Sequence, residues 1–205
     1  MESVARGGTR WKRFAVVMVP SVAATAAIGV ALSQGALAAS FAVSGQQFKV
    51  TAKRLEGKNF VQYGAMEVSH NGKHIPVAVS GFKSATIEGL CQSVVIPVPL
   101  FGDVSLNLRA GDKGEKVRAK NLYIDLDQLD ADAVFRDINI GVAAEASTKG
   151  PGVKEGDRTV EGSFAQEARS ATLTDVEQTA WATSAGTFRL PDLSLSVKRG
   201  KHECY

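Results

Sequence analysis

Three histidines, His70, His74 and His202, are the residues that could supply the general base of a hydrolase. His70 and His74 flank Asn71-Gly72, a pair that predicts a hairpin turn. A hairpin brings no third ligand close to these two imidazoles, so we interpret them as solvated turn residues. No Gly-x-Ser-x-Gly elbow, phosphate loop, dinucleotide fingerprint or zinc cluster occurs in the sequence. The sequence therefore predicts no catalytic residue and no cofactor.

The densest group of carboxylates lies between residues 125 and 137. Asp125 and Asp127 share one face of a predicted strand, and Ca²⁺ favours carboxylate oxygens. The glycine-spaced geometry of calcium loops is missing, and each Asp in this segment has an apolar neighbour. We interpret the segment as a solvated strand face that binds no metal, with Asp125 and Asp127 as the nearest candidates for ligands.

Cys91 and Cys204 are the two cysteines of the chain. In an oxidising compartment outside the cytoplasm they are expected to form a disulfide. Closing a loop of about 110 residues contributes about 4–5 kcal/mol if the effect is chain entropy, and it would fasten the C-terminal end. The alternative is a nucleophilic Cys91 with a histidine base, which requires a partner placed beside it by the fold.

The first 38 residues have the plan of an export signal. Residues 1–13 are basic, residues 14–32 carry no charge, and Ala36 and Ala38 are the small residues of a cleavage site before Ala39. The alternative is a retained hydrophobic helix that anchors the protein, because the apolar stretch is long enough to span a bilayer. In either case the basic front end directs residues 39–205 out of the cytoplasm, so the protein is secreted or membrane-anchored.

Charge and composition describe a neutral globular body. The net charge is +3, but four of the 24 basic residues and one of the 21 acidic residues lie in the first 38 positions, so residues 39–205 are formally neutral. This balance argues against nucleic-acid binding, which needs a clustered basic surface. A hydrophobic content of 44% is sufficient for a core. We expect one extracytoplasmic domain over residues 39–205.

A repeated six-residue pattern indicates that this domain is β-rich. Each copy starts with Asp and then alternates apolar with small or polar residues, as a strand with one buried face does. The copies are Asp103-Val104-Ser105-Leu106-Asn107-Leu108, Asp137-Ile138-Asn139-Ile140-Gly141-Val142 and Asp192-Leu193-Ser194-Leu195-Ser196-Val197. Their recurrence suggests duplicated supersecondary units.

The alternation shifts phase twice between residues 121 and 142, at Asp127-Gln128 and at Arg136-Asp137. These two breaks lack Gly, Pro and Asn, so a tight reversal is disfavoured. A strand that bends while Leu122, Leu129 and Ile138 stay inward satisfies the pattern, as in a β-solenoid or a strongly bent sheet. A β-sandwich with bulges at both breaks is the alternative. Residues 147–163 are Gly-rich and predict a surface loop.

Four segments resemble a known family. They are Gly7 to Ala15, Asn121 to Leu126, Ala180 to Phe188 and Glu203-Cys204-Tyr205. Together they are similar to an uncharacterised exported family of filamentous actinobacteria, of the Streptomyces type, whose members are often catalogued as "cholesterol esterase". The resemblance covers nearly the whole chain and implies export and an envelope setting in a high-GC Gram-positive cell. The label implies a serine hydrolase, but the sequence offers no matching motif onto which catalytic residues could be carried.

Taken together, these features predict a non-enzymatic, exported cell-envelope protein. Its β body would bind an envelope or membrane lipid or assemble with protein partners. A lipid or sterol-ester hydrolase with an unconventional site is the first alternative. A structural surface protein that self-associates is the second.

Overall fold

The computed structural model describes residues 45–205. The predicted signal peptide or anchor, its hydrophobic helix and the cleavage site at Ala36, Ala38 and Ala39 lie outside these residues. The described part has seven strands and one 3₁₀ turn: β1 (Phe48–Val68), β2 (His74–Glu88), β3 (Leu90–Val98), β4 (Gly102–Ala110), β5 (Val117–Ala143), η1 (Ala144–Ala146), β6 (Phe164–Arg189) and β7 (Ser194–Arg199). The predicted all-β body is confirmed. Within residues 45–205, no helix has the length and apolar character that a membrane crossing needs.

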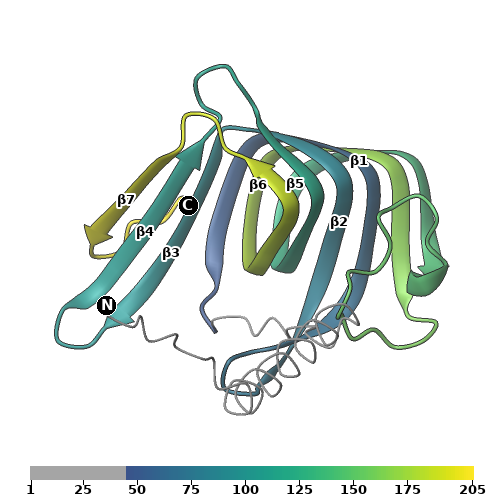
Figure 1. Ribbon diagram of the computed structural model, residues 1–205, viewed down its shortest axis with the longest axis horizontal. Helices are drawn as coiled ribbons and strands as arrows, with labels where there is room; N and C mark the ends of the chain where they lie inside the picture. Colours follow the sequence, from purple (N-terminus) through teal and green to yellow (C-terminus); the bar gives the residue numbers. More distant parts are fainter. Residues whose placement is uncertain (1–44) are drawn as a thin grey trace, which may run out of the picture. The chain divides into compact units, whose positions relative to one another are not determined.

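All seven strands belong to one antiparallel sheet in which β1, β2, β5 and β6 form a closed ring of partners. Gly64 of β1 pairs with Ala78 of β2, which pairs with Leu126 of β5, which pairs with Ala180 of β6. Ala180 in turn pairs with Phe48 of β1, so one circuit of the ring returns to β1 sixteen positions before Gly64. A stagger this large over four strands makes the strands run steeply around the interior. The arched ribbons in Figure 1 show this coiled, strongly bent sheet.

Strands β3, β4 and β7 extend the sheet beyond the coil, and we call them the wing. β1 pairs with β2 along most of its length and continues onto β3 through Lys49–Thr51. β4 pairs with β3, and β7 pairs with β4. Figure 1 shows the wing to the left of the arched strands.

Residues with left-handed backbone mark a line along which the sheet bends. Asn59, Asn121 and Asp137 have φ angles of 54°, 48° and 55°. The paired residues around them place all three in one row with Arg169 and Lys83 from the intervening strands. Asn and Asp are the side chains that tolerate this conformation best, so a bend inside a strand selects them.

A second bend line crosses the sheet six positions away on β1. It contains Asp175, Gly89, Gly111 and Asp192, with φ angles of 52°, 64°, 72° and 53°. Lys53 separates Asp175 from Gly89 in this row, and a Cβ at Gly89 would lie 2.9 Å from Lys53 Cγ. The aliphatic stem of Lys53 therefore occupies the space that a side chain at Gly89 would need.

Each six-residue repeat begins at or directly after a left-handed residue. The copies that start at Asp137 and Asp192 begin at such a residue and then run extended, as far as Ile140 in the first copy, where the left-handed Gly141 follows with φ 87°. The copy that starts at Asp103 comes directly after Gly102, with φ 79°. A left-handed residue followed by an extended segment is thus the unit that the sequence repeats.

Replacing Asn59 with Val should lower the free energy of unfolding by about 1–2 kcal/mol, because a β-branched side chain is disfavoured in the left-handed region. Urea titration of the purified domain measures the change. Asn59→Gly is the matched control and should stay within about 0.5 kcal/mol of wild type, because glycine adopts this backbone without steric cost. Equal losses in both variants would show that the amide side chain, and not the bend, carries the effect.

The inner face of the coil forms the larger of two apolar clusters. Leu122 is fully buried there, and Leu129 and Ile138 pack against the same cluster. The inward orientation predicted from the two phase shifts is therefore confirmed. Register shifts occur in β5 between Asp125 and Gln128, so the bulge that the alternative invoked is present at the first predicted break. At the second break, Arg136-Asp137, the register continues without a shift, and the left-handed Asp137 marks a bend in its place.

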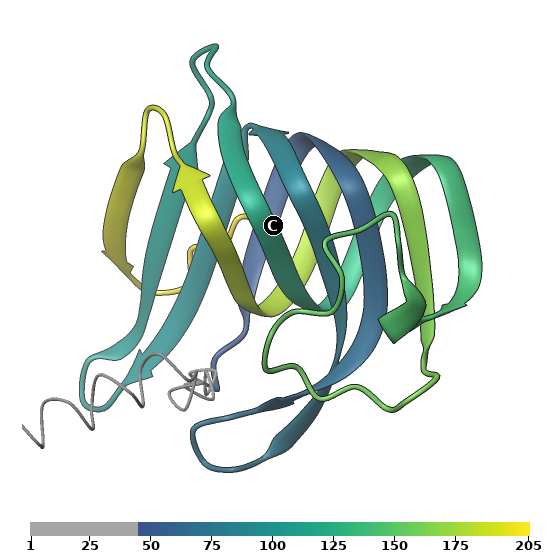
Figure 2. The same ribbon diagram turned by 45° about the vertical axis from the view of Figure 1, so that its right-hand side comes forward.

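The smaller cluster lies on the outer face of the coil, beneath residues 147–163, which form no strand or helix. A Cβ at Gly150 would lie 2.4 Å from Cβ of Val61, and Val153 packs against the cluster. Figure 2 shows this loop in green, crossing the arched strands. The loop thus covers apolar residues that would otherwise face water.

Candidate functional site

An apolar cavity of about 190 Å³ lies inside the coil. Aliphatic and aromatic side chains of β1, β2, β5 and β6 form most of its wall. The lining residues are Leu55, Phe60, Gln62, Ser80, Phe82, Ile124, Leu126, Leu129, Ala131, Ala133, Phe135, Leu173 and Gln178. A smaller void of about 30 Å³ follows, and it shares Leu55, Ile124 and Gln178 with the cavity.

Two of the three polar residues in the wall are already hydrogen-bonded. Gln62 Nε2 donates to Ser80 Oγ at 2.9 Å, and Gln166 Nε2 donates to Gln62 Oε1. These three residues are direct cross-strand partners on β6, β1 and β2. They form a closed polar row that needs no ligand.

Gln178, the third polar residue of the wall, differs from these two because its side chain forms no hydrogen bond within the described residues. It is 6% exposed and lines both the cavity and the smaller void. Within residues 45–205 its amide makes no side-chain hydrogen bond. The Gln178 amide atoms are not fully enclosed, so they are free to bind a ligand that carries one hydrogen-bonding group.

The cavity reaches the surface along the second half of β5. Residues 117–126 of β5 lie between β2 and β6, whereas residues 128–143 pair with β6 on one side alone within the described chain. Ala133 from this segment lines the cavity and is exposed, and Leu129 and Phe135 are half-buried. An apolar chain can therefore enter here without opening the strand ladder.

The Asp side chains of β5 lie in two different places. Some are exposed beside residues 128–143, the part of β5 that pairs on one side alone, and one is buried on the outer face of the coil. Asp127, Asp130 and Asp132 are exposed beside the unpaired segment, where charge opposes edge-to-edge pairing with a second sheet. Asp125 is 1% exposed and lies on the outer face under the loop. The predicted pair of Asp125 and Asp127 is thus split by the bulge at 125–128. Within residues 45–205, no group of three or more His, Cys, Asp and Glu side chains is arranged to hold a metal ion.

The inner face of the wing continues the apolar lining outward. Leu90 and Gln92 of β3 line the smaller void, and Val94 and Ile96 follow them on the same face. Across the wing, Val94 is level with Leu106 and Val197, and Gln92 with Leu108 and Leu195. Leu195 and Val197 are 60% and 66% exposed. An apolar path therefore runs from the exposed wing to the interior of the coil.

The three histidines lie away from the cavity. His70 and His74 are exposed at the β1–β2 hairpin, and His202 is exposed in the C-terminal segment, where its Nε2 lies 3.1 Å from the Arg199 carbonyl. None of them contributes to the cavity wall. The structure brings no predicted candidate base to this site.

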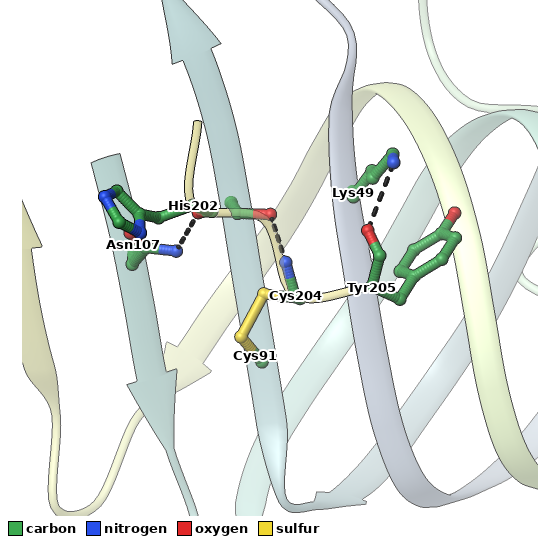
Figure 3. The surroundings of a disulfide bond; sticks show 7 residues. Lys49, Cys91, Asn107, His202, Cys204 and Tyr205 are labelled. Carbon is green, nitrogen blue, oxygen red and sulfur yellow. Dashed lines mark hydrogen bonds between the residues drawn. A yellow bond between two sulfur atoms is a disulfide. The ribbon is translucent and has the colours of Figure 1, made fainter. Parts of the chain in front are cut away.

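Cys91 of β3 and Cys204 are joined by a disulfide, as expected from the sequence. The bond holds the last residues across the face of the wing opposite the apolar path. Cys204 N donates to Ser93 Oγ at 2.9 Å, and Asn107 Nδ2 donates to the His202 carbonyl at 2.8 Å (Figure 3). Lys49 Nζ donates to the Tyr205 carbonyl at 3.1 Å and lies over the Tyr205 ring. The polar face of the wing is thereby covered.

Glu167 anchors the beginning of the loop. Its carboxylate accepts hydrogen bonds from Asn139 Nδ2, Ser147 Oγ, and the backbone N–H groups of Thr148 and Lys149, at 2.9, 2.9, 2.6 and 2.8 Å. Burial acts to raise the pKa of Glu167, but these four donors outweigh it and lower the pKa to about 2. The loop therefore depends on an ionised Glu167.

Glu167→Gln should lower the free energy of unfolding by about 2–3 kcal/mol at pH 7, because the amide cannot accept from all four donors. The folded-state pKa is depressed, so the wild-type advantage is fully present above about pH 4.5 and is lost as the pH falls towards 2. Urea titrations of both proteins at pH 7 and pH 3 test this. A difference that stays constant between the two pH values would contradict the role of the ionised carboxylate.

Comparison with known proteins adds the family. A family model described as a family of unknown function, DUF6230, matches residues 44–205. The chain belongs to this family. The DUF6230 match spans the entire coil, the wing and both cysteines, so the cavity and the loop lie within the shared unit. Searches of curated proteins and of solved structures found no match to this chain.

Proposed function

We propose that this DUF6230 protein is an exported, non-enzymatic envelope protein that holds one slender, neutral lipid chain in the cavity of its coiled sheet. The observation that carries the proposal is the apolar cavity with the unpartnered Gln178 amide in its wall. The predicted export segment and the Cys91–Cys204 disulfide support a location outside the cytoplasm.

The size of the cavity selects the class of ligand. At about 190 Å³ it is comparable with an engineered cavity of about 150 Å³ that binds benzene, and smaller than the roughly 300–1,000 Å³ of pockets for drug-sized molecules. A single hydrocarbon chain fits this volume better than a rigid, fused-ring sterol. Together with the distant histidines, this favours lipid binding over sterol-ester hydrolysis.

The chemistry of the wall selects a neutral ligand. No lining residue of the cavity or of the smaller void carries a charge. An ionised carboxylate or phosphate would lose its hydration there without a counter-charge, which is strongly unfavourable. A hydroxyl, ester or amide group suits Gln178, and a charged headgroup, where the lipid has one, would remain at the surface. The exposed apolar residues of the wing offer a path on which such a chain approaches.

Native mass spectrometry and displacement of a fluorescent apolar probe test the proposal, with a long-chain primary alcohol and its methyl ester as ligands. We expect saturable binding of one molecule per chain. Gln178→Leu should weaken binding of the alcohol more than binding of an alkane of equal length, because the alkane gains nothing from the amide. Absence of saturable binding of every chain tested would refute the proposal.

A further inference from the structure

A partly buried lysine and two buried carboxyl groups meet on the outer face of the coil. Lys154 Nζ, from the loop, lies 3.1 Å from Asp125 Oδ2 on β5. Glu67 of β1, which is 9% exposed, is 3.8 Å from the same nitrogen. Tyr63 and Tyr123 come from the same two strands, β1 and β5, and their hydroxyl groups also form hydrogen bonds with the loop. The amine of a side chain that is 20% exposed is thus held against a carboxyl group that is 1% exposed.

The protonation states within this site are distributed unevenly. Burial raises the pKa of Glu67, and the Asp125 carboxylate raises it further. In its protonated form Glu67 donates a hydrogen bond to Asp125. Asp125 Oδ1 is buried and has no hydrogen-bond partner in the structure of the described residues. Burial also raises the pKa of Asp125 itself, against the opposing effect of Lys154.

The third nearby carboxyl group has a different role. Asp157 Oδ1 is 3.6 Å from Lys154 Nζ, but Asp157 Oδ2 accepts a hydrogen bond of 2.6 Å from Tyr63 Oη. The same tyrosine oxygen accepts from the Lys154 backbone N–H at 2.8 Å. Tyr63 therefore fixes both Asp157 and the backbone that carries Lys154. Asp125 is left as the carboxyl group closest to the amine.

We propose that Lys154 and Asp125 become joined by an intramolecular amide bond, with Glu67 moving the protons. The ammonium of Lys154 passes one proton to the carboxyl pair, and the neutral amine attacks Cγ of Asp125. The new C–N bond forms as one C–O bond breaks, and that oxygen leaves as water with two of the three ammonium protons. The third proton remains on the amide nitrogen. The reaction needs no oxidant, reductant or activated co-reactant.

The geometry favours this condensation in two ways. Lys154 Nζ is held 3.1 Å from Asp125 Oδ2, an oxygen bonded to the Cγ that the amine attacks, so most of the entropy that a bimolecular encounter would cost has already been lost. Burial of Asp125 also disfavours its charged form and so favours a neutral amide. Burial acts to lower the pKa of Lys154, but the surrounding carboxylates raise it overall, so the ammonium must pass a proton to the Asp125–Glu67 carboxyl pair before the amine can attack. The bond would fasten the loop to a strand residue 29 positions earlier in the chain.

Intact-mass spectrometry of the folded, purified full chain tests the proposal directly. We expect a mass below that of the disulfide-bonded sequence by one water molecule, and a branched proteolytic peptide that contains Lys154 and Asp125. Full mass in the wild-type protein would overturn the proposal. A water loss mapped to Asp157, to Glu67 or to a site elsewhere would overturn it as well.

Variants of the three residues separate chemistry from folding. Lys154→Arg, Asp125→Ala and Glu67→Gln should each restore the full mass, and circular dichroism reports whether each variant folds. Lys149→Arg is the matched control, because Lys149 lies in the same loop and 2.9 Å from Asp137, which is exposed. This control should keep the water loss. Persistence of the loss in folded Asp125→Ala would contradict the assignment. The outcome is independent of lipid binding, since the cavity lies on the other face of the sheet.

Discussion

Removing the disulfide by the double substitution Cys91→Ala and Cys204→Ala should lower the free energy of unfolding by about 4 kcal/mol and Tm by about 8–16 °C. The bond spans 113 positions of sequence, so it restricts the unfolded chain over most of the domain. It also holds the C-terminal segment on the polar face of the wing, where Ser105 and Asn107 are buried by it. Thermal and urea unfolding of the oxidised protein and of the double variant measure the change.

Lys49→Ala provides the control for the tail contacts themselves. It removes the ion pair to Glu203 at 3.3 Å and the contacts to Tyr205 but leaves the disulfide in place. Because these groups are partly exposed, the loss should be below about 1 kcal/mol. A double variant as stable as wild type, or a Lys49→Ala variant equally unstable, would show that the covalent bond is not what stabilises the domain.

Filling the cavity should abolish lipid binding without unfolding the protein. Ala131 is half-buried in the cavity wall near its surface opening, and Ala131→Phe places a ring in the space that a hydrocarbon chain would occupy. We expect binding of a long-chain alcohol to weaken by at least about tenfold, equivalent to about 1.4 kcal/mol. Tm should fall little or rise, because the ring enters existing empty volume.

Ala146→Phe is the matched control for this substitution. Ala146 is exposed at the end of η1 and is not part of the cavity wall, so the same ring added there should leave binding unchanged. Unchanged binding in folded Ala131→Phe would move the ligand away from the cavity, most simply to the exposed face of the wing.

Local patterns in the sequence were sufficient to predict that the strands bend. Asp127-Gln128 and Arg136-Asp137 displaced the alternation by one position, and side chains that alternate faces make such a displacement visible without any structure. Asp137 proved to be one of the left-handed residues at a bend, as did Asp192 at the head of another repeat. The residue type and the phase shift both report the same local backbone.

Long-range features escaped the same reasoning. The return of β6 to β1 closes the coil through pairs such as Val50 with Gln178, which are far apart in sequence and share no local pattern. In the sequence Gln178 looks like an ordinary polar residue of a strand, and it becomes buried only because β6 pairs with β1 and closes the ring of strands. In the same way, Asp125 was indistinguishable from the exposed Asp127 until the loop brought Lys154 onto it. A Gln in an otherwise apolar row of the closed sheet is the signal that would have identified the site.

Methyl-resolved NMR of the DUF6230 protein during titration with a long-chain alcohol shows directly whether the lipid chain occupies the cavity. We expect the largest chemical-shift changes, and nuclear Overhauser contacts to the chain, at the methyl groups of Leu55, Leu126 and Leu173 inside the coil. Changes confined to Leu195 and Val197 on the wing, with the interior methyl groups unmoved at saturation, would contradict this expectation.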